Sequence, residues 1–211
     1  MTHEFDRDYW EQHWRQRPIG TRGSMATNPP NPYLARETEN LAIGTALDAG
    51  CGAGAEAIWL AFAGWRVTAV DISPEALGIA AERAATSGVA DRIRWVEADL
   101  SVWQPDRQFD LVTSHYAHPA IPQLDFYTRL ATWVKPGGTL LIVGHLHTSG
   151  DANHAHHPAE EVAVTVAAIT ERLDPTDWRV ETADECHRTL SGSGGREVSL
   201  HDVVVRATRL D

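Results

Sequence analysis

The chain has 211 residues, of which 43% are hydrophobic and 22% charged, and its formal net charge is −11. This length suits one α/β domain, since a second independently folded core would need more chain than remains after the first. No stretch approaches the roughly 20 apolar residues that a membrane span requires. With 18 Lys and Arg against 29 Asp and Glu, the chain is unsuited to a nucleic acid, whose phosphates require clustered basic residues.

The N-terminus and the two cysteines indicate the cellular setting. The first residues, MTHEFDRDYWEQHW, are charged and aromatic, whereas a secretory signal would show a basic start followed by a continuous apolar run. Cys51 and Cys186 match no metal or redox spacing, so we expect both to be reduced. These features predict a cytoplasmic protein without a membrane anchor, either a monomer or a homodimer.

The N-terminal part predicts an aromatic helix followed by a loop. Phe5, Tyr9, Trp10 and Trp14 stand at spacings of four, one and four, which places them along one stripe of a helix over 6–16. From 18 to 32 the chain is rich in Gly, Thr, Asn and Pro, a composition that favours a loop. We therefore separate residues 1–33, an aromatic helix with a covering loop, from a domain of residues 34–211.

The domain alternates short apolar runs with longer amphipathic ones. The five apolar runs that predict strands are TALDA, WRVTAV, RIRWVE, FDLVTS and TLLIVGH. The segments that predict helices are 34–43, 54–63, 74–86, 123–133 and 158–172. Ser73 and Pro74 suit the start of the helix at 74–86. WRVETADE and VSLHDVVVRAT flank SGSGG, which indicates an antiparallel hairpin at a sheet edge. The pattern predicts a doubly wound, mostly parallel sheet.

The first strand runs into a glycine-rich turn, Asp48-Ala49-Gly50-Cys51-Gly52-Ala53-Gly54-Ala55, directly before a helix. Glycines let the backbone turn sharply and approach a nucleotide-like ligand without a Cβ in the way. Gly50, Gly52 and Ala55 also satisfy the dinucleotide pattern G-x-G-x-x-A, with Asp71 about 20 residues further on. By itself the turn is therefore compatible with NAD as well as with other adenosine ligands.

Asp48 distinguishes these ligands. Its carboxylate lies at the end of the first strand, where a dinucleotide would place its anionic pyrophosphate. Like charges in a partly desolvated cleft repel each other by several kcal/mol on the order of Coulomb estimates. S-adenosylmethionine has no phosphate and carries an ammonium and a sulfonium, so Asp48 favours it, directly or through water.

Acidic residues also follow the second and third strands. Asp71 can accept hydrogen bonds from both ribose hydroxyls while Ile72 covers one face of the adenine. Asp99 can accept from the adenine amino group, with Leu100 beside the ring. Three acidic residues at three successive strand ends are thus expected to converge on one crevice.

The motifs LDAGCGAGAEA, VTAVDIS, EADL, FDLVTSHYAH and VKPGGTLLIVGH occur in this order across residues 44–145. In order and spacing they resemble the class I S-adenosylmethionine-dependent methyltransferases. YWEQHW and NPPNPYL, with the compact size, look most like the small bacterial methyltransferases related to tellurite-resistance and thiopurine S-methyltransferases. The resemblance implies a seven-stranded sheet whose last strand is inserted antiparallel. It also implies methyl transfer to a small-molecule acceptor with an S, O or N nucleophile, leaving S-adenosylhomocysteine.

The resemblance and the strand ends together define a predicted site. The expected cofactor contacts are Asp48, Ala49, Gly50, Cys51, Gly52, Gly54, Asp71, Ile72, Asp99, Leu100, Ser114 and His115. The expected acceptor side comprises Trp10, Trp14, Tyr116, His145 and His147. His115 and His118 are candidate general bases for a hydroxyl or thiol. They equally fit a structural role, facing the helix after Pro122 or solvent.

Several alternatives remain at this stage. His145, His147, His154, His156 and His157 could suit a metal, but the metal-assisted members of the family use carboxylates and Asn for magnesium, so we expect a polar substrate-side loop and no metal. The chain lacks the N-P-P-Y motif after the fourth strand. A protein of this fold that binds the cofactor without catalysis, and an NAD-dependent oxidoreductase, are the competing hypotheses.

Overall fold

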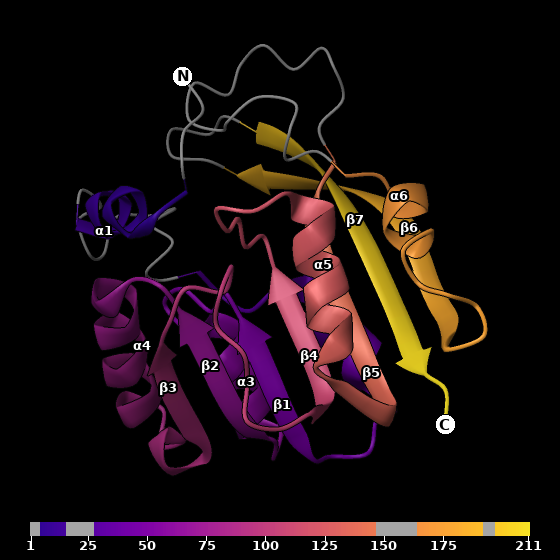
Figure 1. Ribbon diagram of the computed structural model, residues 1–211. Helices are drawn as coiled ribbons and strands as arrows, with labels where there is room; N and C mark the ends of the chain where they lie inside the picture. Colours follow the sequence, from indigo (N-terminus) through magenta and orange to yellow (C-terminus); the bar gives the residue numbers. More distant parts are fainter. Residues whose placement is uncertain (1–4, 16–27, 147–163, 192–196) are drawn as a thin grey trace.

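The computed structural model describes residues 5–15, 28–146, 164–191 and 197–211, and within them a seven-stranded sheet with the strand order β3-β2-β1-β4-β5-β7-β6 (Figure 1). The strands are β1 Thr45–Ala49, β2 Arg66–Asp71, β3 Ile93–Glu97, β4 Phe109–His115, β5 Val134–His145, β6 Trp178–Ser191 and β7 Glu197–Arg209. The helices are α1 Arg7–Arg15, α2 Pro32–Thr38, α3 Ala55–Phe62, α4 Pro74–Thr86, α5 Gln123–Thr132 and α6 Val166–Thr170. Among the described residues no helix is long and apolar enough to cross a membrane.

The direction of the strands confirms the predicted fold class. β3, β2, β1, β4 and β5 pair in parallel, while β7 runs antiparallel to both β5 and β6. All five predicted apolar runs form strands, and the predicted C-terminal hairpin is the β6–β7 pair at the sheet edge. The last strand is thus inserted between its two predecessors, as the family resemblance implies.

Helices cover both faces of the sheet. Phe126 of α5 and Ile169 of α6 pack with one set of strand residues, whereas Leu34 of α2, Leu60 of α3 and Leu77 of α4 pack with the alternate set. Because successive side chains of a strand point to opposite faces, each central strand must be apolar on both sides. This explains the near-continuous apolar runs in the sequence.

Helix boundaries differ from the sequence prediction in α2 and α6. The helix expected at 34–43 covers Pro32–Thr38, because the side chain of Asn31 caps it by accepting a hydrogen bond from the backbone N–H of Tyr33 (3.0 Å). Ile43 continues the apolar pattern but is 63% exposed, so it has no surface to pack on. Of the helix expected at 158–172, Val166–Thr170 is helical, while residues 158–163 lie outside the described part.

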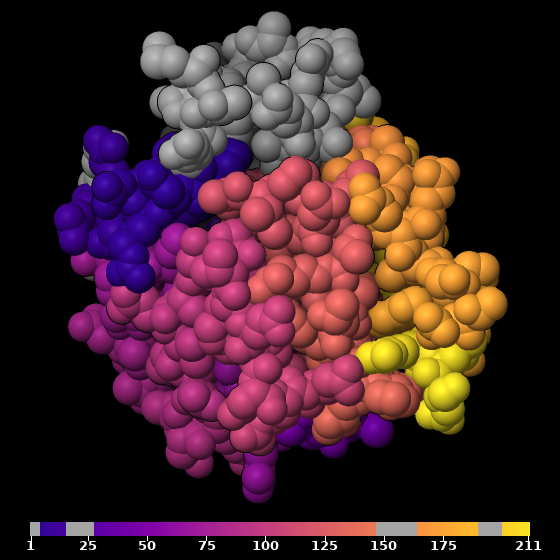
Figure 2. Space-filling model, viewed as in Figure 1, coloured from indigo at the N-terminus to yellow at the C-terminus, as the bar shows by residue number. Residues whose placement is uncertain are grey.

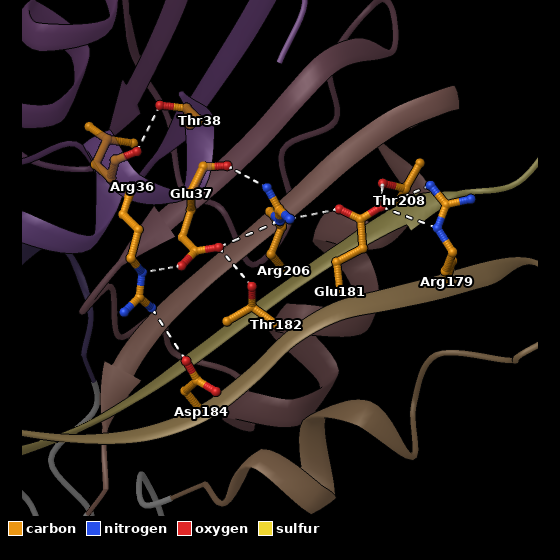
Figure 3. Close-up of polar contacts among 10 residues, drawn as sticks. Arg36, Glu37, Thr38, Arg179, Glu181, Thr182, Asp184, Arg206 and Thr208 are labelled. Carbon is orange, nitrogen blue, oxygen red and sulfur yellow. Dashed lines mark hydrogen bonds and ion pairs between the residues drawn. The ribbon is translucent and has the colours of Figure 1, made fainter. Parts of the chain in front are cut away.

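A polar network fastens α2 to the C-terminal hairpin (Figure 3). The buried carboxylate of Glu37 accepts hydrogen bonds from Arg36 (2.6 Å) and from the hydroxyl of Thr182 on β6 (2.8 Å). Its backbone oxygen accepts from Arg206 on β7 (3.0 Å), and Arg206 also pairs with Glu181 (2.9 Å). A buried carboxylate is stable only when paired, so this network fixes the position of α2 and of Asn31 and Tyr33 at its start.

Candidate functional site

The glycine-rich turn joins β1 to α3 at the end of the sheet toward which the parallel strands point (Figure 1). Gly50 and Gly52 have φ values of 78° and 50°, a region that glycine enters without steric cost. The backbone N–H groups of Gly50 and Cys51 both donate to the carbonyl of Val70 on β2 (2.8 and 3.0 Å). The turn is therefore held tightly against the next strand, as its sequence predicts.

Both glycines also have a close protein neighbour. A Cβ on Gly50 would lie 2.3 Å from the Cβ of Ala117, just after β4, and a Cβ on Gly52 would lie 3.0 Å from the ring of Trp14 on α1. The sequence predicts that glycine is needed at these positions because a ligand approaches the turn closely. The structure adds a second reason, because α1 and the segment after β4 themselves pack on the turn.

Asp48, at the end of β1, is buried with 1% exposure. Its Oδ2 has no hydrogen-bond partner among the described residues. Burial raises the pKa of this carboxyl well above its usual value, the negative charges of Glu56 and Asp71 raise it further, and only the backbone N–H of Ala57 opposes them. The site thus contains a buried acceptor whose ionised form needs a positive charge.

Asp71 lies at the end of β2 and connects the turn to α4. Its two carboxylate oxygens accept hydrogen bonds from the backbone N–H groups of Gly52 (2.8 Å) and Ser73 (3.0 Å). Burial raises the pKa of Asp71, although bonds from the Ser73, Gly52 and Ile72 N–H groups counteract it. Each carboxylate oxygen can accept more than one hydrogen bond, so these contacts leave capacity for a ligand hydroxyl.

The predicted adenine contacts lie at the end of β3. Leu100 is buried with 7% exposure, and Asp99 is half-buried. Oδ1 of Asp99 accepts from the backbone N–H and the hydroxyl of Ser101 (2.8 and 2.6 Å). Asp99 therefore organises its own turn, and its contact with adenine stays a prediction.

Helix α1 contacts the turn through Trp14, and in Figure 2 the indigo helix lies against the neighbouring magenta part of the surface. Glu11, only 8% exposed, accepts hydrogen bonds from the Ser73 hydroxyl (2.6 Å) and the Glu75 N–H (3.3 Å) at the start of α4, and pairs with Arg15 (2.8 Å). A carboxylate is favoured at a helix N-terminus. A cavity of about 480 Å³ lies beside this contact. Its lining residues are Arg7, Asp8, Glu11, Gln12, Arg15 and Pro74.

The end of β4 carries Ser114 and His115, both predicted cofactor contacts. The Ser114 hydroxyl donates to the carbonyl of Ala49 (3.0 Å). Nδ1 of His115 lies 3.3 Å from the Thr113 hydroxyl, while its Nε2 is buried without a hydrogen-bond partner among the described residues. Burial lowers the pKa of His115, so this imidazole is held in its neutral form.

His118, the other candidate base, lies where α1 meets the segment before α5. Its carbonyl accepts a hydrogen bond from Nε1 of Trp10 (3.3 Å), and its Nδ1 lies 3.3 Å from Oε1 of Gln123. Phe5 packs on its ring at a centroid distance of 5.8 Å. The structure thus brings Trp10 and His118 together, and Trp14 against Gly52.

A further cluster lies at the ends of β4 and β5. Tyr116 stacks on His145 with ring centroids 4.2 Å apart, and Nδ1 of His145 lies 3.4 Å from Oδ1 of Asp202 on β7. Arg188 on β6 pairs with Asp202 and donates to the Tyr116 hydroxyl (2.8 Å). Sequence reasoning missed Glu11, Arg188 and Asp202. His147 lies outside the described residues.

The remaining expectations concern cysteine and metal chemistry. Both cysteines are free. Burial raises the pKa of the Cys51 thiol well above its usual value, and the negative charges of Asp71 and Asp48 raise it further. A thiol kept protonated is a poor nucleophile. The part of the chain that the structure describes contains no group of three metal-ligating side chains, and His154, His156 and His157 lie outside it.

Known proteins share both sequence and fold with this chain. Residues 46–138 match the family model for a methyltransferase domain. The chain is 27% identical over 191 residues to thiocyanate methyltransferase 1 of Arabidopsis thaliana, covering 89% of this chain and 81% of that protein. TehB from Haemophilus influenzae has a TM-score of 0.69 at 16% identity, covering 89% of this chain and 64% of TehB. The N-methyltransferase NodS from Bradyrhizobium japonicum WM9, in complex with S-adenosylhomocysteine, has a TM-score of 0.67 at 18% identity. The match covers 95% of this chain and 98% of NodS.

The site suits the cofactor of this family. Oδ2 of Asp48 is buried, has no hydrogen-bond partner among the described residues and lies near other negative charges. The positive charges of S-adenosylmethionine would stabilise this carboxylate, whereas the pyrophosphate of NAD would add negative charge to the same place. The family pattern is present in order: the glycine turn, Asp71 at the end of β2, and the inserted antiparallel strand. With the methyltransferase-domain match over residues 46–138, these features have the sequence and fold pattern of the class I S-adenosylmethionine-dependent methyltransferases.

Proposed function

We propose that this chain transfers the methyl group of S-adenosylmethionine to a small-molecule acceptor, with a sulfur nucleophile as the first candidate. The observation that carries the proposal is the buried Asp48 carboxylate, whose Oδ2 has no partner among the described residues beside the glycine turn. A cationic adenosine ligand would supply the positive charge that this carboxylate needs. The similarity to a thiocyanate methyltransferase over 89% of the chain supports a sulfur acceptor.

The predicted roles of the cofactor residues follow from their positions. Asp48 would face the cationic methionine part, the backbone of Gly50 and Gly52 would permit close approach, and Asp71 would accept from the ribose hydroxyls. Asp99 and Leu100 would contact the adenine. The bound cofactor supplies a methyl group already activated by the positive sulfur, so the protein mainly aligns the acceptor and excludes water. Trp10 and Trp14 on α1 would assist that exclusion.

A turnover assay tests this function. The purified chain is incubated with S-adenosylmethionine and, separately, with alkyl and aromatic thiols, thiocyanate, phenols and heteroaromatic amines. We expect S-adenosylhomocysteine and methylated acceptor in equal amounts, with sulfur acceptors fastest. Asp48→Asn, which removes the charge but keeps the shape, should lose cofactor affinity, whereas Asp91→Asn on an exposed turn should behave like the unaltered chain.

The same assay distinguishes methyl transfer from the competing hypothesis of cofactor binding without catalysis. If the chain binds S-adenosylmethionine but produces no S-adenosylhomocysteine with any acceptor, it is a cofactor-binding protein of this fold without catalysis. If Asp48→Asn binds the cofactor as tightly as the unaltered chain, the charge complementarity at the turn is wrong.

A further inference from the structure

The cluster of Tyr116, His145, Arg188 and Asp202 lies at the carboxyl ends of β4 and β5. His145 is the last residue of β5 and pairs in register with Asp202 on β7, and Tyr116 follows the last residue of β4 directly. The side chain of Asp202 is fully buried, while that of His145 is 18% exposed. The cluster therefore joins an interior carboxylate to an imidazole that is partly exposed.

Asp202 is arranged to orient the imidazole. Its Oδ2 is held by Arg188 and accepts from the Tyr33 hydroxyl (3.3 Å), while its Oδ1 is buried and faces Nδ1 of His145 at 3.4 Å. That separation exceeds an ordinary hydrogen bond, and such contacts commonly tighten when the ligand binds. Burial would raise the pKa of Asp202, but His145 and Arg188 outweigh it and lower the pKa, so the carboxylate stays ionised.

Tyr116 links this pair to the glycine turn. Its φ of 56° is the single positive value among the described residues other than glycine, a conformation that costs on the order of 1–3 kcal/mol. Asn31 and Arg188 hold its hydroxyl by hydrogen bonds (3.0 and 2.8 Å). The next residue, Ala117, packs on Gly50. The stacked His145 ring is thereby fixed relative to the cofactor turn.

We propose that His145 is the general base for acceptors that carry a proton on the nucleophilic atom, and that Asp202 is its positioning residue. This inference rests on the proposed function. In the tautomer that keeps its proton on Nδ1, toward Asp202, the imidazole has its lone pair on Nε2. Nε2 takes the proton of an acceptor X–H, and the electron pair left on X forms the bond to the methyl carbon. The methyl–sulfur bond breaks with its electron pair staying on sulfur, and the imidazolium then returns its proton to water.

The other two histidines are less suited to this role. His115 is buried, with Nδ1 beside the Thr113 hydroxyl, and His118 lies between Trp10 and Gln123 at the contact with α1. His145, in contrast, faces the carboxylate of Asp202. Among the described residues, the charged and titratable groups in this cluster with His145 are Asp202, Arg188, Tyr116 and Tyr33, and the carboxylate of Asp202 carries its negative charge.

Two sulfur acceptors of opposite ionisation test the proposal. Ethanethiol is protonated near neutral pH, whereas para-nitrothiophenol is already a thiolate and needs no base. In His145→Gln, the ratio of the ethanethiol rate to the nitrothiophenolate rate should fall by about 100-fold, the usual contribution of a general base. Asp202→Asn should lower the same ratio by a smaller factor. His187→Gln, on the exposed side of β6, is the matched control and should keep the ratio.

The outcomes distinguish this inference from the function on which it rests. Cofactor affinity, measured by calorimetry, shows that each variant is folded, and a merely structural role would lower both acceptor rates together. An unchanged ratio in His145→Gln, or an unaltered chain that methylates the thiolate and not ethanethiol, overturns the assignment of His145 alone. An unaltered chain that methylates no acceptor overturns the proposed function as well.

Discussion

Replacing Gly50 with alanine should lower the free energy of unfolding by about 3 kcal/mol and abolish measurable cofactor binding. The new Cβ would lie 2.3 Å from the Cβ of Ala117 on a backbone with φ of 78°. The strained backbone and the overpacking each cost on the order of 1–3 kcal/mol. Relief requires the segment after β4 to move away from the turn, which displaces Tyr116 and His115. Urea unfolding and a calorimetric titration with S-adenosylmethionine measure the two effects.

Gly78→Ala provides the control for this substitution. Gly78 lies on the exposed side of α4, and a Cβ there would meet no atom within 4 Å. Alanine in a helix interior is favoured over glycine by about 0.5–1 kcal/mol, so this variant should be slightly more stable and bind the cofactor normally. If Gly50→Ala were as stable as Gly78→Ala, the tight contact between the turn and Ala117 would be contradicted.

Asp71→Ala should weaken S-adenosylmethionine binding more than tenfold, or by about 1.4 kcal/mol. The substitution removes the proposed acceptor of the ribose hydroxyls. It also leaves the N–H groups of Gly52 and Ser73 without their acceptor, which costs about 1–3 kcal/mol for a buried donor. Calorimetry gives the affinity, and urea unfolding in the absence of cofactor gives the stability of the same variant.

Two comparisons isolate the ligand contact in that experiment. Asp91→Ala, on an exposed turn, should change neither quantity. Asp71→Asn keeps one good acceptor oxygen and should be more stable than Asp71→Ala while still binding weakly. Unchanged affinity in both Asp71 variants would remove this residue from the cofactor site.

The strand pattern could be predicted because burial on both faces imposes a local signature. Runs such as those of β1 and β4 are apolar on both faces along much of their length. Ser73 caps α4 through a bond to the N–H of Ala76, three residues away (3.1 Å). The end of α2 could not be predicted in the same way. Ile43 extends the periodic pattern, and only the folded structure shows that it is exposed.

The missed site residues depend on contacts between distant parts of the chain. Glu11 meets Ser73 across 62 positions, and Arg188 meets Tyr116 across 72. No local spacing encodes such pairs. A signal was available for Asp202, which is a charged residue next to the apolar run Val203–Val205 in the predicted hairpin, where a polar side chain in a buried strand requires a partner. The glycine turn was found because its signature is contiguous.

A parallel calorimetric titration with S-adenosylmethionine and with NAD tests most directly whether buried negative charge at the sheet edge selects the ligand. We predict saturable binding of S-adenosylmethionine in the micromolar range, equivalent to about −8 kcal/mol, and no heat with NAD. Absence of heat with S-adenosylmethionine, or comparable binding of NAD, would contradict the role assigned to Asp48 and the glycine turn.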